Sequence, residues 1–203
     1  MNRPKEKAAG ILLAAGESRR MGRIKQLLPV GQETLIEHVL AQVLASRLDA
    51  VVLVLGHQAG EIRAVIEPRF RDPRLCIIQN YQYRQGISSS IAAGVTAVEK
   101  RHNHAMIFLA DMPCISSAVI DRLLDRHVMS GAVISAIRGE GRPAHPVVFR
   151  RDLYPELKRL QGDQGARGLV YKYGGSLCLV EPATGYDSRD IDTPEDYAAF
   201  QTA

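Results

Sequence analysis

Short apolar runs alternate with segments of helical periodicity over most of this chain of 203 residues. In residues 34–45, Leu35, Val39 and Leu40 recur at the spacing of one helix face, whereas residues 51–55 are continuously apolar. Continuous apolar strands between amphipathic helices are typical of a mainly parallel sheet that is covered on both faces. The pattern therefore predicts an α/β fold with a mainly parallel (mixed) sheet, in which ligands bind at the carboxyl ends of the strands.

The predicted elements follow one another without a linker or an internal repeat, so we expect a single domain over residues 1–203. A last helix is expected to begin at Pro194, with Thr193 as its N-cap. Glycine and proline loosen the pattern at about residues 138–176, which we interpret as an elaboration of the domain. The other strands are expected at residues 11–14, 75–79, 106–110, 132–137, 146–149 and 177–180, and the other helices at 59–66, 88–98, 116–128, 153–160 and 166–171.

Composition limits the class of protein. Hydrophobic residues make up 46% and charged residues 24% of the chain, which is typical of a globular domain with a core. The net charge is +4, but the basic residues are spread along the chain and only 7 Tyr and 4 Phe are available for stacking, so we expect no nucleic-acid partner. The chain has three cysteines without metal-binding spacing, which predicts a cytoplasmic protein. Its apolar runs are too short to span a bilayer, so we expect no membrane partner.

The first predicted strand stops in a loop that is rich in glycine and basic residues. Gly16 and Gly22 allow sharp turns, while Arg19, Arg20 and Lys25 bring positive charge to the same concavity. The glycine spacing matches neither the GxGxxG dinucleotide motif nor the GxxxxGK[ST] phosphate loop. From these residues alone, a phosphate-binding loop of another type and a solvated basic turn both remain open.

Acidic residues stand at two positions where they could bind a metal ion. Asp111 follows the predicted strand at residues 106–110, and Asp190 and Asp192 precede the last helix. Carboxylates that converge from separate loops suit a hard divalent cation that also binds a triphosphate. Each position also has a structural explanation, because loop aspartates accept backbone hydrogen bonds and acidic residues stabilise helix N-termini.

The stretch LAAGESRRMGRIK at residues 13–25 resembles the LAAGxSxRMGxxK signature of small nucleotidyltransferases. Within that superfamily the chain is most similar to the molybdenum cofactor cytidylyltransferases, although Ala144 stands where that family has a glycine. The resemblance implies a Rossmann-like nucleotidyltransferase fold with the elaboration on the acceptor side. The further matching segments are GISSSI at 86–91, DMP at 111–113, HPVVF at 145–149, GDQGAR at 162–167 and DIDTPEDY at 190–197.

This resemblance implies a reaction in which CMP is transferred from CTP to a molybdenum-pterin phosphate with Mg²⁺ as the cofactor, releasing pyrophosphate and forming a dinucleotide cofactor. It implies magnesium ligands at Asp111 and Asp192, with Asp190 as a further candidate. Lys25, Arg19 and Asp111 are the implied catalytic residues, and a molybdoenzyme that receives the product is an implied partner. The residues implied to bind nucleotide or acceptor are Leu13, Ala14, Ala15, Gly16, Ser18, Gly22, Gly86, Ser88, Ser89, His145, Asp163 and Arg167.

Other functions are open at this point. GTP could replace CTP, although we expect the methyl group of Ala15 to crowd a purine, and a sugar or alcohol phosphate could be the acceptor. An NADPH-dependent oxidoreductase on the same scaffold and a non-catalytic carrier of the cofactor are alternatives of other classes. Ser18 is expected to support the loop backbone, and His57, Cys114, Tyr81 and Tyr83 are interpreted as structural.

Overall fold

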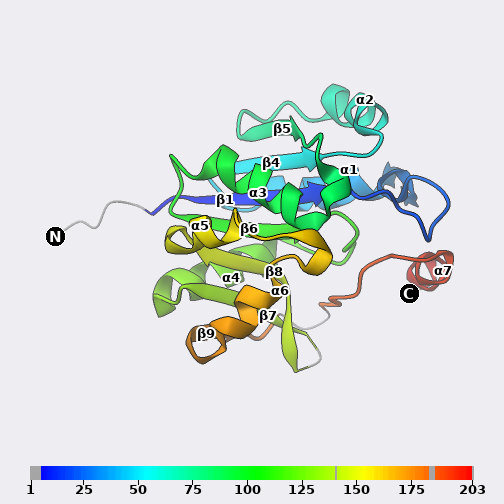
Figure 1. Ribbon diagram of the computed structural model, residues 1–203. Helices are drawn as coiled ribbons and strands as arrows, with labels where there is room; N and C mark the ends of the chain where they lie inside the picture. Colours follow the sequence, from blue (N-terminus) through cyan, green and yellow to red (C-terminus); the bar gives the residue numbers. More distant parts are fainter. Residues whose placement is uncertain (1–5, 140, 183–185, 203) are drawn as a thin grey trace.

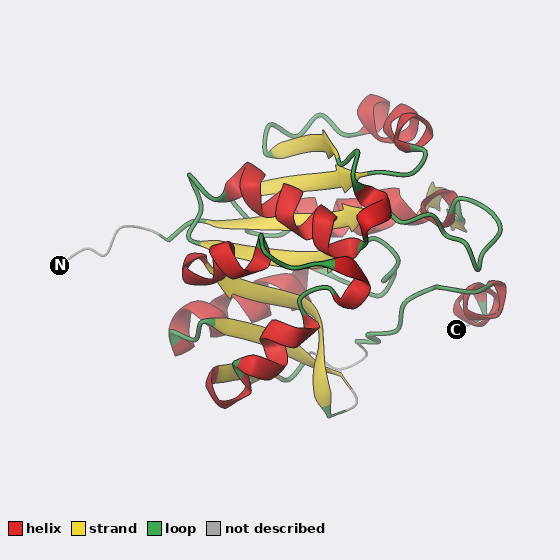
Figure 2. Cartoon of the chain, in the orientation of Figure 1, coloured by secondary structure: helices red, strands yellow, loops and turns green. Residues whose placement is uncertain are grey.

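The computed structural model describes residues 6–139, 141–182 and 186–202. Within these residues, seven strands form one sheet in the order β5-β4-β1-β6-β8-β7-β9, with helices on both faces (Figures 1 and 2). Strand β8 is antiparallel to both of its neighbours, and the remaining neighbours pair in parallel. The predicted α/β class with a mixed sheet is thus confirmed. The strands are β1 (Ala8–Ala14), β4 (Ala50–Leu55), β5 (Leu75–Gln79), β6 (His104–Leu109), β7 (Ile134–Gly139), β8 (Arg142–Arg150) and β9 (Leu177–Val180).

Alternate residues of β1 enter two hydrophobic cores, one on each face of the sheet. Leu12 belongs to a core with helices α1 (Leu35–Ala45), α2 (Ala59–Arg69) and α4 (Ser117–Ser130), which also includes Tyr197 of α7. Ile11 and Leu13 belong to the other core, with helices α3, α5 and α6 in front of the sheet in Figure 1. These remaining helices are α3 (Ile87–Val98), α5 (Tyr154–Leu157), α6 (Arg167–Lys172) and α7 (Pro194–Gln201).

Strand order reverses between β1 and β6, because β4 and β5 follow on one side of β1 and β6 follows on the other. Parallel strands on the two sides of such a reversal leave a crevice at their carboxyl ends, where open α/β sheets bind ligands. The loop after β1 and the C-terminal segment before α7 meet at this edge, where Lys25 Nζ donates to Asp192 Oδ1 at 2.8 Å. The topology therefore brings residues from the start and the end of the chain to one crevice.

The predicted elements match the observed ones in type and order, with two differences. The expected helix at 153–160 is a 3₁₀ turn at Arg151–Leu153 followed by the single turn of α5. The hairpin of β2 (Pro29–Val30) and β3 (Glu33–Thr34) is missing from the sequence prediction, because strands of two residues show no periodicity. Further 3₁₀ turns lie at Lys25–Leu27, Tyr83–Gln85, Gly162–Gln164 and Gly174–Ser176.

Helix α3 lies close to the sheet because it carries a glycine at the contact. A Cβ at Gly94 would overlap the Ile11 side chain and lie 3.3 Å from Val54 Cγ2. We expect Gly94→Ala to destabilise the fold by about 1–3 kcal/mol, the usual cost of overpacking a core. Denaturant unfolding measures this loss. Gly168→Ala is the control, because a Cβ there meets nothing within 4 Å, and equal stability of the two variants would contradict the close packing of α3.

Candidate active site

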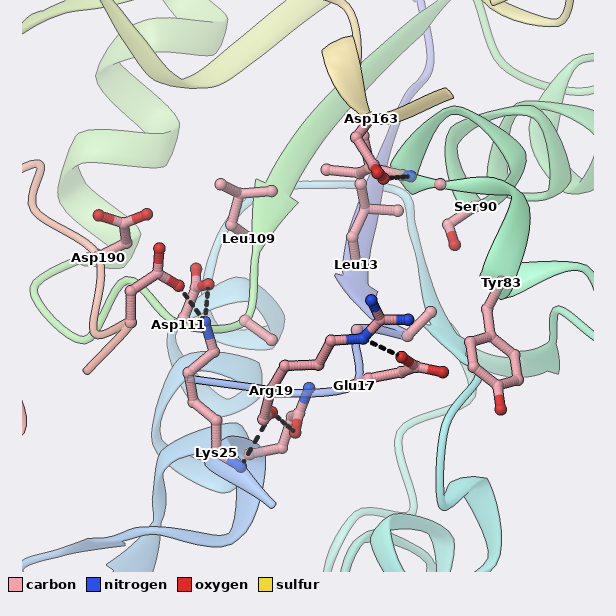
Figure 3. A pocket seen from close by; sticks show the side chains of 18 of the residues that line it. Leu13, Glu17, Arg19, Lys25, Tyr83, Ser90, Leu109, Asp111, Asp163 and Asp190 are labelled. Carbon is pink, nitrogen blue, oxygen red and sulfur yellow. Dashed lines mark hydrogen bonds and ion pairs between the residues drawn. The ribbon is translucent and has the colours of Figure 1, made fainter. Parts of the chain in front are cut away.

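A cavity of about 650 Å³ lies at the carboxyl ends of β1 and β6, at the predicted edge of the sheet. Figure 3 shows side chains that line it from the loop after β1, the start of α3 and the end of β6. The C-terminal segment closes one side with Asp190 and Asp192. A cavity of this size suits a small-molecule ligand, since such sites occupy about 300–1,000 Å³.

The loop after β1 is folded around Ser18. Ser18 has φ of +53°, its carbonyl accepts from Met21 N at 3.0 Å, and its hydroxyl accepts from Lys25 N at 3.2 Å. The Met21 side chain is buried in the core and anchors the loop to the domain. Gly22 turns the chain with φ of +68°. Ser18 thus supports the loop backbone, as expected, and directs Lys25 toward the cavity.

Lys25 lies between two aspartates from distant parts of the chain. Its Nζ is 2.5 Å from Asp111 Oδ2 and 2.8 Å from Asp192 Oδ1, and the lysine side chain is only 12% exposed. Burial acts to lower the pKa of Lys25, but the two carboxylates outweigh it, and the pKa lies above its ordinary value. The pKa of Asp192 is held below its ordinary value by Lys25 and Arg20, against an opposing effect of burial. Lys25 is therefore charged at neutral pH.

Asp190 completes a cluster of three carboxylates. One oxygen each of Asp111, Asp190 and Asp192 lies within 4.8 Å of the others. The cluster forms because Ile191 is buried in the core at 2% exposure and its N–H donates to Asp111 O at 2.9 Å, so the aspartates that flank it can reach Asp111. Burial first, and then the charges of Asp111 and Asp192, raise the pKa of Asp190.

The chemistry of this cluster fits a divalent cation. Asp111 Oδ1 is buried and has no hydrogen-bond partner within the described part of the chain. Carboxylate oxygens are the ligands that Mg²⁺ and Mn²⁺ prefer, and a buried unpartnered acceptor is costly unless a cation or donor satisfies it. Asp111, Asp190 and Asp192 are the residues that could hold such an ion.

Further ion pairs line the rim of the cavity. Arg19 Nε lies 2.6 Å from Glu17 Oε2, and Arg84 Nε lies 3.4 Å from Glu17 Oε1. These contacts, the hydrogen bond from Arg19 above all, hold the pKa of Glu17 below its ordinary value. Tyr83 also lines the cavity, with the Arg84 guanidinium 5.7 Å from its ring centroid. The sequence analysis did not name Glu17 or Arg84, and Tyr83, which it interpreted as structural, lines the cavity as well.

A second cavity of about 320 Å³ adjoins the first. Asp163 and Arg167 line both, and the side chains deeper in the second cavity are mostly apolar, among them Ile107 and Met112. His145 lines it too, and its Nδ1 lies 3.3 Å from Ile107 O, an acceptor that requires the proton on Nδ1. Burial is the main cause that lowers the pKa of His145, so the ring is neutral at neutral pH. The structure thus brings His145, Asp163 and Arg167 into one neighbourhood, as expected.

Comparison with known proteins identifies the family of this chain. Residues 10–176 match the family described as MobA-like NTP transferase domain. The chain belongs to this family. The resemblance to nucleotidyltransferases is thereby confirmed, and the protein is a nucleotidyltransferase of the MobA-like type.

Among the described residues, none of its helices is both long and apolar enough to cross a membrane.

Relatives of this MobA-like domain carry several different names. This chain is 34% identical over 202 residues to the purine catabolism protein PucB of Bacillus subtilis, and the match covers 96% of each chain. It is 33% identical over 195 residues to nicotine blue oxidoreductase of Paenarthrobacter nicotinovorans and 28% identical over 188 residues to molybdenum cofactor cytidylyltransferase of Escherichia coli, covering 92% of each chain in both cases. A solved structure of Rv0371c from Mycobacterium tuberculosis in complex with manganese has a TM-score of 0.80 and 26% identity, covering 97% of this chain and 99% of that one.

The start of α3 in the MobA-like domain lies against the GDQG segment. Asp163 Oδ1 accepts a hydrogen bond from Ile87 N at 3.2 Å, so a carboxylate of the protein already occupies this helix N-terminus (Figure 3). Gly86 has φ of +100°, and a Cβ there would overlap Gly162. Asp163 and Gly86 therefore hold the GDQG segment against α3, and Asp163 also lines both cavities.

The resemblance implied that Ala14, Gly22, Ser88 and Ser89 bind nucleotide or acceptor, but these four residues line neither of the two cavities. Ser88 is buried, and Ser89 Oγ accepts from Asn80 Nδ2 at 2.8 Å, so both serines point away from the cavity, where Ser90 stands instead. The helical period explains this, because Ser90 is three residues from Ile87 and shares its face. Ala14 lies in the core beneath the loop, and Gly22 serves only to turn it.

The other residues that the resemblance implied line one cavity or both. Besides Asp190, eleven of them line the larger cavity, which brings the loop after β1, the two acidic motifs and the GDQGAR segment together. These are Leu13, Ala15, Gly16, Ser18, Arg19, Lys25, Gly86, Asp111, Asp163, Arg167 and Asp192.

Proposed function

We propose that this protein transfers CMP from CTP to the phosphate of a molybdenum-pterin acceptor, with Mg²⁺ as cofactor, and forms a dinucleotide cofactor. The observation that carries the proposal is the cluster of Asp111, Asp190 and Asp192 around Lys25, in a cavity that opens into an apolar neighbour. The Escherichia coli relative, a molybdenum cofactor cytidylyltransferase, supports the choice of nucleotide and acceptor. A molybdoenzyme that receives the product is part of the same proposal.

In this reaction an acceptor phosphate oxygen attacks the α-phosphorus of CTP, a new P–O bond forms, and the bond to the pyrophosphate breaks. Lys25 and Arg19 bind the triphosphate and neutralise the charge that develops on the leaving pyrophosphate. Asp111, Asp190 and Asp192 would hold the magnesium ion, which, when bound, neutralises charge as a Lewis acid. The structure of Rv0371c with manganese supports a divalent cation in a related protein.

The acceptor occupies the second cavity in this proposal. Its apolar lining suits a planar ring system, and Tyr171 stands at its edge with 70% of its surface exposed. Arg167 lines both cavities, which supports a bidentate contact between its guanidinium and the acceptor phosphate. His145 is neutral and contributes shape rather than charge.

The size of the residue at position 15 is proposed to favour CTP over GTP. Ala15 lines the larger cavity, and its methyl group is packed against Gly56, where an added Cβ would lie 2.8 Å from it. We expect Ala15→Gly to improve the affinity for GTP relative to CTP about tenfold, the value of one methyl group in a pocket. Calorimetry with both nucleotides measures the ratio. Ala14→Gly is the control, because Ala14 is buried outside the cavity, and an unaltered ratio in Ala15→Gly would remove the crowding argument.

The function itself is tested by calorimetry with CTP, GTP, ATP and NADPH, with and without Mg²⁺, followed by an assay of pyrophosphate release with the molybdenum-pterin acceptor. We expect CTP with Mg²⁺ to bind best and pyrophosphate release to depend on both. The relative named nicotine blue oxidoreductase makes NADPH the necessary comparison. Even with Lys25 and Arg20 paired to it, the cluster of three carboxylates keeps one negative charge in excess, which disfavours a dinucleotide diphosphate in the absence of a metal ion. Tight metal-free binding of NADPH would therefore overturn the proposal.

A further inference from the structure

Three cations of the loop after β1 are each paired with a carboxylate of the protein. Lys25 contacts Asp111 and Asp192, and Arg20 Nη2 lies 2.6 Å from Asp192 Oδ2. Arg19 is held by Glu17 on the rim. Lys25, which is proposed to bind triphosphate, and Asp111 and Asp192, which are proposed to bind metal, therefore neutralise one another in this structure.

Lys25 and a divalent cation would use the same carboxylates. The Lys25 ammonium contacts one oxygen of Asp111 and one of Asp192, two of the three residues of the acid cluster. A cation of higher charge at these carboxylates repels the ammonium and takes over its partners. Because the Lys25 side chain is 12% exposed, leaving it without an anionic partner carries a desolvation penalty. A triphosphate in the adjoining cavity supplies such a partner.

We propose that Lys25, assisted by Arg20, is an internal counter-cation: it neutralises the acid cluster in the free protein and transfers to the triphosphate when a divalent cation binds. This inference rests on the proposed nucleotide-binding function. Neither ligand alone satisfies all the charges, since the cation leaves Lys25 unpaired and the triphosphate leaves the carboxylates unpaired. The two ligands therefore bind with positive coupling, which by linkage is the same whichever binds first.

The test compares Mn²⁺ binding in the absence of nucleotide, measured by the paramagnetic resonance signal of free Mn²⁺, among four full-length proteins. We expect Lys25→Met to bind Mn²⁺ about tenfold more tightly than the wild type, within the usual range of coupling between sites. Arg20→Met, whose side chain is 70% exposed, is expected to gain about threefold, because exposed ion pairs are weak. Arg23→Met is the matched control, since it removes one charge from the same loop. The Arg23 guanidinium lies over the Tyr197 ring, 5.6 Å from its centroid, and not against the acid cluster.

A second arm measures CTP affinity with and without Mn²⁺ in the same proteins. The enhancement by Mn²⁺ is expected to be largest in the wild type and at least about fivefold smaller in Lys25→Met. The complex of Mn²⁺ with CTP in solution is common to all variants, so it cancels in the comparison. Should Lys25→Met fail to fold, Arg20→Met alone carries the test.

Unchanged Mn²⁺ affinity in both Lys25→Met and Arg20→Met, or an equal gain in Arg23→Met, would overturn the counter-cation role. Absence of CTP binding to the wild type with Mn²⁺ would instead overturn the proposed function. The Mn²⁺ arm separates these two results, because it requires no nucleotide.

Discussion

Asp111→Asn is expected to leave a folded protein whose kcat/KM for pyrophosphate release is about 10³-fold lower, a loss of about 4 kcal/mol. Asparagine keeps the size of the side chain and the backbone carbonyl that accepts from Ile191 N. It removes one negative charge from the acid cluster and one of the two carboxylates that contact Lys25. The expected loss follows because both the metal site and the placement of Lys25 depend on this one group.

The control for Asp111→Asn is Asp187→Asn, which removes a carboxylate from the C-terminal segment that carries Asp190 and Asp192. Asp187 pairs with Arg189 at 2.7 Å and lies outside both cavities, so its variant is expected to keep nearly normal activity. Circular dichroism and thermal unfolding establish that both variants fold. Activity of Asp111→Asn within about threefold of the wild type would remove Asp111 from the metal site.

The fold could be predicted from the sequence because the patterns that determine its helices and strands are local. The alternation of apolar runs and amphipathic helices fixes the order of the elements, and Thr193 and Pro194 mark the start of α7 by cap chemistry, with Thr193 Oγ1 accepting from Asp196 N at 3.2 Å. The place of Asp111 follows similarly, since it comes two residues after the buried strand β6. Resemblance then identified which loops belong together.

Which charged group pairs with which could not be predicted from the sequence in the same way. Arg20 and Asp192 are 172 residues apart, and Asp163 and Ile87 are 76 residues apart. A sequence shows that each group carries charge or donates a hydrogen bond, but the partner depends on the loop conformations. Asp163 was predicted at the binding site from the resemblance, whereas its hydrogen bond from Ile87 N at the start of α3 was not predicted. Ser90 could have been found from the helical period alone, because it shares a face with Ile87.

Lys25→Ala is expected to cost about 2–4 kcal/mol of transition-state stabilisation, which lowers kcat/KM about 30- to 1,000-fold. In the proposed reaction, this substitution removes a preorganised charge from the point where the leaving pyrophosphate gains negative charge. Steady-state kinetics with CTP and the molybdenum-pterin acceptor measure the effect. Arg23→Ala is the control, because it removes a charge from the same loop without a contact to the acid cluster.

The distribution of the Lys25→Ala loss between kcat and KM distinguishes two roles of this side chain. A lysine that only bound the triphosphate of the ground state would raise KM and leave kcat unchanged, whereas one that acts on the leaving group lowers kcat. We expect the fall in kcat to dominate, because Lys25 gives up its contacts with Asp111 and Asp192 to bind the nucleotide, and that cost offsets its contribution to ground-state binding. Unchanged kcat/KM would mean that Lys25 serves only to neutralise the aspartates.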